Sequence, residues 1–162
     1  MRTNNYNFIG LIILICLLFV TFENGEAKND FLSELITIYR QKDYQKVIDQ
    51  IDKDPEQANL YTDQTALLKL QSFLALGQMT RAHEFLLKEE KNRQLTIFDH
   101  LWFLYLDALI NQKRTDSIED VYHHFQSIST LSILLYQSSW QIAELFRNEK
   151  NYNQAINYYI ES

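Results

Sequence analysis

The side chains that could perform chemistry are sparse, and their densest group lies between residues 119 and 124. Glu119, Asp120, His123 and His124 stand within this segment. Because Glu119 and His123 are four residues apart, both could reach one metal ion from the same side of a helix. Adjacent histidines, however, point about 100° apart on a helix, so His123 and His124 cannot both join that site. We therefore expect no metal site and interpret the segment as the solvated polar face of a helix.

Motifs for nucleophilic catalysis and phosphate binding are also missing from the sequence. The only cysteine, Cys16, lies in an apolar N-terminal run, and no Gly-x-Ser-x-Gly elbow is present. The 3 glycines of the chain could hardly supply a glycine-rich phosphate loop. The sequence therefore predicts a protein that is not an enzyme, has no catalytic residues and needs no cofactor.

The elements that must position any binding residues are predicted to be helices. Among 162 residues there are only 3 Gly and 1 Pro, while 46 % of the residues are hydrophobic. So few helix-breaking residues, together with so much apolar content, favour an all-α fold. The net charge is −6, and the Lys and Arg residues are scattered rather than gathered in the basic patch of a nucleic-acid binder. We expect no nucleic-acid partner.

Residues 1–27 have the layout of a targeting segment. Arg2 gives a polar start, residues 8–22 form an uncharged and mainly apolar run, and Gly25 and Ala27 are small residues of the kind that precede a cleavage site. This pattern is typical of a secretory signal peptide cleaved after Ala27; an uncleaved N-terminal membrane anchor is the alternative. Either form predicts an extracytoplasmic body, periplasmic or secreted, with a membrane contact only through this segment.

Apolar residues in the rest of the chain recur at the spacing of paired helices. Near the C-terminus one apolar stripe ends at Phe146, a polar break covers 148–151, and a second stripe runs from Tyr152 to Tyr159. This pattern predicts a helix, a tight turn and an antiparallel second helix. We predict four such pairs in one domain, 28–162, over the ranges 29–58, 60–92, 97–129 and 133–162. In the first pair, Pro55 is expected to end the second helix.

A small or β-branched residue is predicted where the two helices of each pair cross. These residues are Val47, Ala82, Val121 and Ala155, at successive separations of 35, 39 and 34 residues. We attribute the longest separation to an insertion in the polar run 88–94. Repetition of a helical pair with a period in the mid-thirties indicates a helical solenoid.

The pairs resemble the tetratricopeptide repeat, whose unit is a 34-residue helix-turn-helix. The resemblance implies a right-handed superhelical solenoid of antiparallel helix pairs, in which first helices line a concave face that holds a peptide or partner helix. Related helical-hairpin repeats and an irregular helical bundle are the alternatives. The third pair departs most, with Gln112 where an aromatic residue is usual. The second and fourth pairs match best, at Leu70, Phe73, Gly77, Ala82 and Leu86, and at Ile142, Ala143, Phe146, Tyr152, Ala155 and Tyr159.

By position, the resemblance places a set of partner-binding residues on the concave face. They combine aromatic, apolar, amide and charged side chains, which could hold a peptide backbone and fill apolar pockets. The residues are Tyr39, Gln64, Leu67, Gln71, Phe103, Gln137, Trp140, Glu144 and Arg147.

The leading functional hypothesis is a non-enzymatic extracytoplasmic scaffold that binds a peptide or partner protein on this face. One alternative is the sensory N-terminal portion of a membrane-tethered bacterial regulator whose output domain is not in this chain. Another is a carrier or accessory subunit for envelope assembly. Tyr158, Tyr159 and Ile160 stand close to Ser162 without a capping helix after them. They predict a longer native chain, a covering partner, or a homo-oligomer formed through the uncapped C-terminal helix, unless these side chains are simply tolerated in solution.

Overall fold

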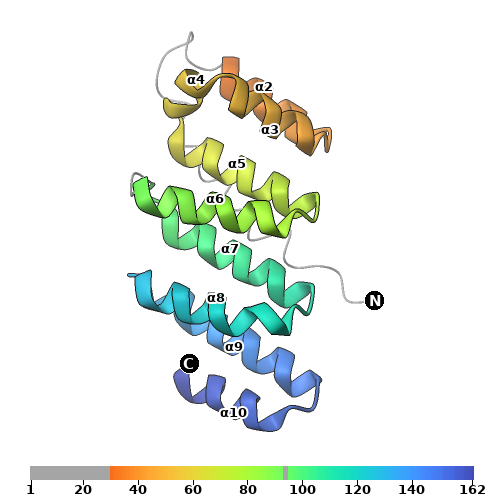
Figure 1. Cartoon of the computed structure of the whole chain (residues 1–162), viewed down its shortest axis with the longest axis vertical. Helices are drawn as coiled ribbons and strands as arrows, with labels where there is room; N and C mark the ends of the chain where they lie inside the picture. Colours follow the sequence, from red (N-terminus) through yellow and green to blue (C-terminus); the bar gives the residue numbers. More distant parts are fainter. Residues whose placement is uncertain (1–29, 93–94) are drawn as a thin grey trace. The chain divides into compact units, whose positions relative to one another are not determined.

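Helices α2 to α10 form the part of the chain that this computed structural model describes, residues 30–92 and 95–162 (Figure 1). Helical residues make up 83 % of those described and no strand occurs among them, which confirms the predicted all-α class. No helix in these two ranges is both long and apolar enough to cross a membrane. The predicted signal or anchor segment, 1–27, lies outside the described residues. The packing divides into two compact units, which meet in sequence between Ser72 and Phe73.

The first unit contains three short helices and the beginning of a longer one. They are α2 (Asp30–Arg40), α3 (Tyr44–Lys53), α4 (Pro55–Asn59) and the start of α5 (Thr62–Ala75). Helices α2 and α3 pack together because each buries an apolar stripe at three- and four-residue spacing. The core of this unit consists of Leu32, Leu35, Ile36, Ile38, Val47, Ile51, Ala58 and Leu68.

Pro55 begins a helix as well as following one. Helix α3 ends at Lys53, as predicted, but Pro55 then occupies the first turn of α4, where a missing N–H costs no hydrogen bond. The Asp54 side chain caps α4 by accepting a hydrogen bond from the backbone N–H of Gln57 at 3.1 Å. The sequence did not predict α4, since five residues are too few to show a helical period.

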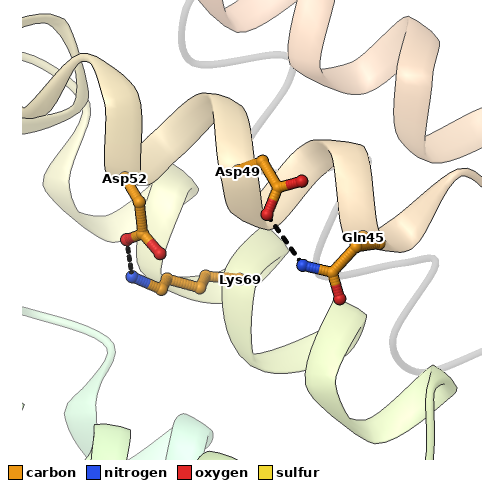
Figure 2. Close-up of polar contacts among 4 residues, drawn as sticks. All are labelled: Gln45, Asp49, Asp52 and Lys69. Atoms are coloured by element: carbon orange, nitrogen blue, oxygen red, sulfur yellow. Dashed lines mark hydrogen bonds and ion pairs between the residues drawn. The ribbon is translucent and has the colours of Figure 1, made fainter.

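Polar contacts join the helices of the first unit. The ammonium group of Lys69 on α5 pairs with Asp52 on α3, and on α3 itself Gln45 Nε2 donates to Asp49 Oδ1 at 2.7 Å (Figure 2). The Thr65 hydroxyl, on α5, donates to the carbonyl oxygen of Ala58, on α4, at 3.1 Å. The Lys69 ion pair and the Thr65 hydrogen bond therefore tie α5 to α3 and to α4.

The second unit contains the end of α5 and five further helices. They are α6 (Met79–Asn92), α7 (Phe98–Asn111), α8 (Thr115–Ile128), α9 (Ser132–Asn148) and α10 (Tyr152–Glu161). Each helix from α6 to α10 packs against the next, and α7 also packs against α9 (Figure 1). Tyr158 of α10 joins three helices, because its ring stacks on Phe146 at 5.7 Å and meets Tyr122 edge-on at 5.4 Å.

The same turn closes the first helix of each pair. Lys42, Gly77, Lys113 and Lys150 have φ values of 63°, 69°, 56° and 62°. After each of them, the next residue donates its N–H to the carbonyl oxygen five residues earlier, at 2.9 to 3.3 Å, as in the Schellman motif. Successive turn residues are 35, 36 and 37 positions apart (42 to 77, 77 to 113, 113 to 150). The chain therefore repeats a local structure with a nearly constant period.

These turns correct the predicted crossing residue of the third pair. Val47, Ala82 and Ala155 each lie five positions after their turn residue, and the equivalent position after Lys113 is Ile118 rather than Val121. Ile118 is fully buried, as Val47 and Ala82 are. The prediction of an insertion at 88–94 was also wrong, since the turn spacing there is 36 residues. A larger crossing residue in this pair concealed the true register.

Candidate partner-binding face

Four of the predicted binding residues come together on one side of α9. Gln137, Trp140, Glu144 and Arg147 follow one another at intervals of three or four residues, so they share one face of the helix. Gln137 and Arg147 are exposed, Glu144 is half-buried, and the large indole of Trp140 is 47 % exposed. We call these four residues the α9 face.

Tyr159 of α10 holds the α9 face in place. Its ring meets that of Trp140 edge-on, with the ring centroids 5.1 Å apart. Its hydroxyl donates a hydrogen bond to Glu144 Oε1, while Arg147 Nη2 donates to Glu144 Oε2. The hydrogen bond to Glu144 is the main cause of the raised pKa of Tyr159, and desolvation adds to it. Both carboxylate oxygens of Glu144 are thus engaged, and Tyr159 links Trp140 and Glu144 across α9 and α10.

The side chains of the α9 face are of kinds that bind peptides. An exposed indole can anchor an apolar or aromatic side chain, and tryptophan is among the residues that contribute most at protein interfaces. The amide of Gln137 can both donate to and accept from a peptide backbone. In the ranges 30–92 and 95–162, no group of three or more His, Cys, Asp and Glu side chains could hold a metal ion.

The other predicted binding residues do not form such a face. Leu67 and Phe103 belong to the buried core, so the prediction that they line an open surface was wrong. A first helix packed on several sides buries residues beside its core stripe as well, and sequence spacing does not reveal this. Tyr39 is half-buried and meets Tyr44 edge-on at 5.2 Å; burial, then the neighbouring Tyr44, raises the pKa of Tyr39 to about 12. Gln64 and Gln71 on α5 are half-buried.

An open pocket of about 440 Å³ lies at the start of α9, and the sequence did not predict it. It is lined by Tyr122 and Gln126 of α8, Ile133 and Tyr136 of α9, and Glu161 of α10. Burial is the main cause of the raised pKa of Tyr122, and the charge of Glu161 adds to it. Ile133, Tyr136 and Trp140 are three and four residues apart along α9, and this spacing could have indicated that exposed apolar side chains continue from the α9 face to the pocket.

The adjacent His123 and His124 lie in different environments, one solvated and one packed. His123 is exposed and 4.0 Å from Glu119, as expected of a polar helix face. His124 differs from the prediction, because its Nε2 lies 2.9 Å from Glu90 Oε2 on α6 and its ring is 4.8 Å from that of Trp102. These contacts bridge α6, α7 and α8 and give His124 a structural role.

Asp107 on α7 is a titratable group that sequence spacing gave no reason to select. Burial raises its pKa to about 6, while hydrogen bonds from Asn111 and from Gln141 on α9 act in the opposite direction. The Asn111 bond to Asp107 Oδ2 is 3.0 Å long. Asp107 therefore lies where α7 and α9 pack together and changes charge close to neutral pH.

Comparison with known proteins adds no relative of this chain. No protein-family model matches the sequence, and neither a curated protein nor a solved structure matches it. The resemblance to the tetratricopeptide repeat therefore rests on the residues and spacing of this chain alone.

Proposed function

We propose that this protein is a non-enzymatic, tetratricopeptide-like scaffold that binds a peptide, or an extended segment of a partner protein, at the α9 face. The observation that carries the proposal is the half-exposed indole of Trp140, which is held by Tyr159 and stands beside the exposed amide of Gln137. A large aromatic side chain that is fixed and only partly covered is a typical binding anchor. The predicted targeting segment would place this binding outside the cytoplasm.

A solenoid arrangement is part of the proposal, and two observations support it. The Schellman turn recurs in all four pairs at nearly constant spacing. In the second unit the first helices α7 and α9 pack against each other, while α8 packs against both of them. Stacked helical hairpins in solenoids make this set of contacts. The right-handed superhelix follows from the resemblance to the tetratricopeptide repeat.

The chemistry of the α9 face limits what it can bind. Trp140 would contact an aliphatic or aromatic side chain, and Gln137 would hold the backbone next to it. The ion pair between Glu144 and Arg147 is partly exposed, so we expect it to contribute little to affinity and to orient the surface. The ligand is therefore expected to be an apolar motif in an extended chain rather than a highly charged segment.

Selection from a displayed library of short random peptides tests this proposal. The library is enriched on the wild-type protein, and the enriched clones are then tested on Trp140→Ala and Tyr152→Ala. Tyr152 is a matched control, because it is an aromatic residue of similar exposure on α10. We expect the clones to lose binding to Trp140→Ala and to keep it with Tyr152→Ala.

Two outcomes would contradict the proposal. One is the absence of any enrichment on the wild-type protein above the bare support. The other is a set of clones that bind Trp140→Ala as well as they bind the wild type.

A further inference from the structure

Helix α10 carries an apolar stripe on the side that faces away from its packing partners. Tyr152, Ile156 and Ile160 stand at four-residue intervals and are 59 %, 55 % and 79 % exposed. The other side of the helix is buried through Ala155 and Tyr158. We call the three exposed residues the α10 stripe. Exposed apolar side chains that are contiguous on one face mark an interaction surface.

Stacking of another helical pair would not account for the whole stripe. Ile160 lies ten residues after the turn residue Lys150, and the equivalent positions in the preceding pairs are Leu87 and His123, ten residues after Gly77 and Lys113. Both are exposed although further helices follow them in the same unit. Position 160 is thus one that stacked pairs leave open, yet here it carries the most exposed large apolar side chain of the described residues.

The charge of α10 favours a second copy of the same chain as the occupant. No charged residue occurs between Tyr152 and Ile160, although the chain as a whole has a net charge of −6. Glu161, the only charged residue of the helix, interacts with Tyr122 on the packed side. Two identical surfaces bring identical charges together, and like charges across an interface are unfavourable. A helix face without charge avoids that repulsion.

We propose that two copies of this chain associate through antiparallel α10 stripes. A two-fold axis passes beside Ile156, so that Ile156 contacts Ile156 of the second copy. The same axis places Tyr152 against Ile160 of the second copy. This pairing covers all three exposed residues at once, including Ile160. Three side chains bury only a few hundred Å² per copy, less than the roughly 800 Å² per partner of a stable interface. The dimer therefore dissociates on dilution.

Analytical ultracentrifugation over a range of concentrations tests the pairing. The protein is used in the form that the expressing cells process, with its N-terminus determined by mass spectrometry, so that residues 1–27 are treated alike in every variant. The samples are the wild type, Ile156→Glu, Ile156→Lys, an equimolar mixture of these two variants, and Trp140→Ala. We expect a concentration-dependent dimer for the wild type and for Trp140→Ala, and monomers for each charged variant at ten times the wild-type midpoint concentration.

The mixture is the decisive sample. If Ile156 faces its own counterpart, opposite charges meet in the mixture and a mixed dimer forms. A mixture that stays monomeric would overturn the antiparallel register. A wild type that is monomeric at every concentration would contradict the dimer and would mean that the α10 stripe binds another protein. Charged variants that dimerise as the wild type does would show that the α10 stripe is not part of the interface. Because Ile156 is exposed, its variants should keep wild-type helicity; if they do not, Ile160→Lys replaces them.

Discussion

Burial of one carboxyl group gives the second unit a residue that titrates close to neutral pH. Burial disfavours the charged form of Asp107 and raises the pKa of this carboxyl group from its ordinary value of 3.8 to about 6. In the unfolded chain this group loses its proton at lower pH. Because its pKa is higher in the folded state, the Asp107 carboxyl group contributes its full stabilisation below about pH 4, and this contribution is lost as the pH rises through 6.

Replacing Asp107 by Asn should remove this pH dependence, since an amide keeps an oxygen for the Asn111 hydrogen bond but has no charge. We expect Asp107→Asn to be more stable than the wild type at pH 7 by about 1–3 kcal/mol, each pKa unit corresponding to about 1.4 kcal/mol. The difference should disappear near pH 4, which provides an internal control. Urea unfolding of both proteins between pH 4 and 7.5 measures it. Parallel stability profiles across this range would contradict the assignment.

At the scale of single residues, the sequence predicted which residues share a helix face better than it predicted how exposed they are. The spacing along 137–147 predicts four residues on one face of a helix, and in α9 three of them are exposed and one is half-buried. The same reasoning wrongly placed Leu67 and Phe103 at a surface, because burial of a first helix depends on how far neighbouring helices cover it. Tyr159 was assigned to the apolar stripe and to the uncapped end of the last helix, but not to the binding face, although it contacts both Trp140 and Glu144.

At the scale of elements, the repeated turns carry a local conformational penalty. Three of the four turn residues are lysines with positive φ, a region that side chains with a Cβ atom disfavour and that glycine adopts easily. Gly77 is the exception, and a Cβ atom added to it would meet nothing within 4 Å. Substitutions at these turns therefore report on backbone conformation rather than on contacts.

Glycine substitutions of lysine should have opposite effects in a turn and in a helix. We expect Lys113→Gly to raise the free energy of unfolding by about 0.5–1 kcal/mol, because Gly relieves the left-handed strain. Lys88→Gly, at an exposed position inside α6, should lower it by about 1 kcal/mol. Gly77→Ala should also lower it by about 1 kcal/mol. Thermal and urea unfolding measure all three, and a Lys113→Gly variant no more stable than the wild type would contradict the role of the turn.

The long helices could be predicted because each shows an apolar period over ten or more residues. What the sequence could not show was α4, which is too short for a period, and the register of the third pair. There the crossing residue is Ile118 instead of a small residue, and the turn residue Lys113 gives no glycine signal. In the third pair, the error came from a chemically ordinary residue, Lys113, in a backbone conformation that usually favours glycine.

At the scale of the whole molecule, the proposed solenoid predicts that a destabilising substitution affects mainly the helical pair that contains it. In a stacked array each pair contacts only its neighbours, so damage in one pair spreads to the adjacent pair and little further. A bundle around a single core would respond as one cooperative unit.

Hydrogen exchange after a core substitution distinguishes these two architectures. Ala155→Leu overpacks the contact between α9 and α10, where Ala143 and Ala155 are both buried, and should destabilise by about 1–3 kcal/mol. We expect amide protection to fall in α9 and α10 and to stay at the wild-type level in α6, which belongs to the same compact unit but not to the adjacent pair. An equal loss of protection in all helices would exclude the solenoid.

The binding function is tested most directly by titration calorimetry of one selected peptide against the wild type and Trp140→Ala. Tryptophan anchors at interfaces contribute about 2 kcal/mol or more, so we expect the variant to bind roughly 30-fold more weakly. Equal affinities for the two proteins would contradict the assignment of the α9 face as the binding site.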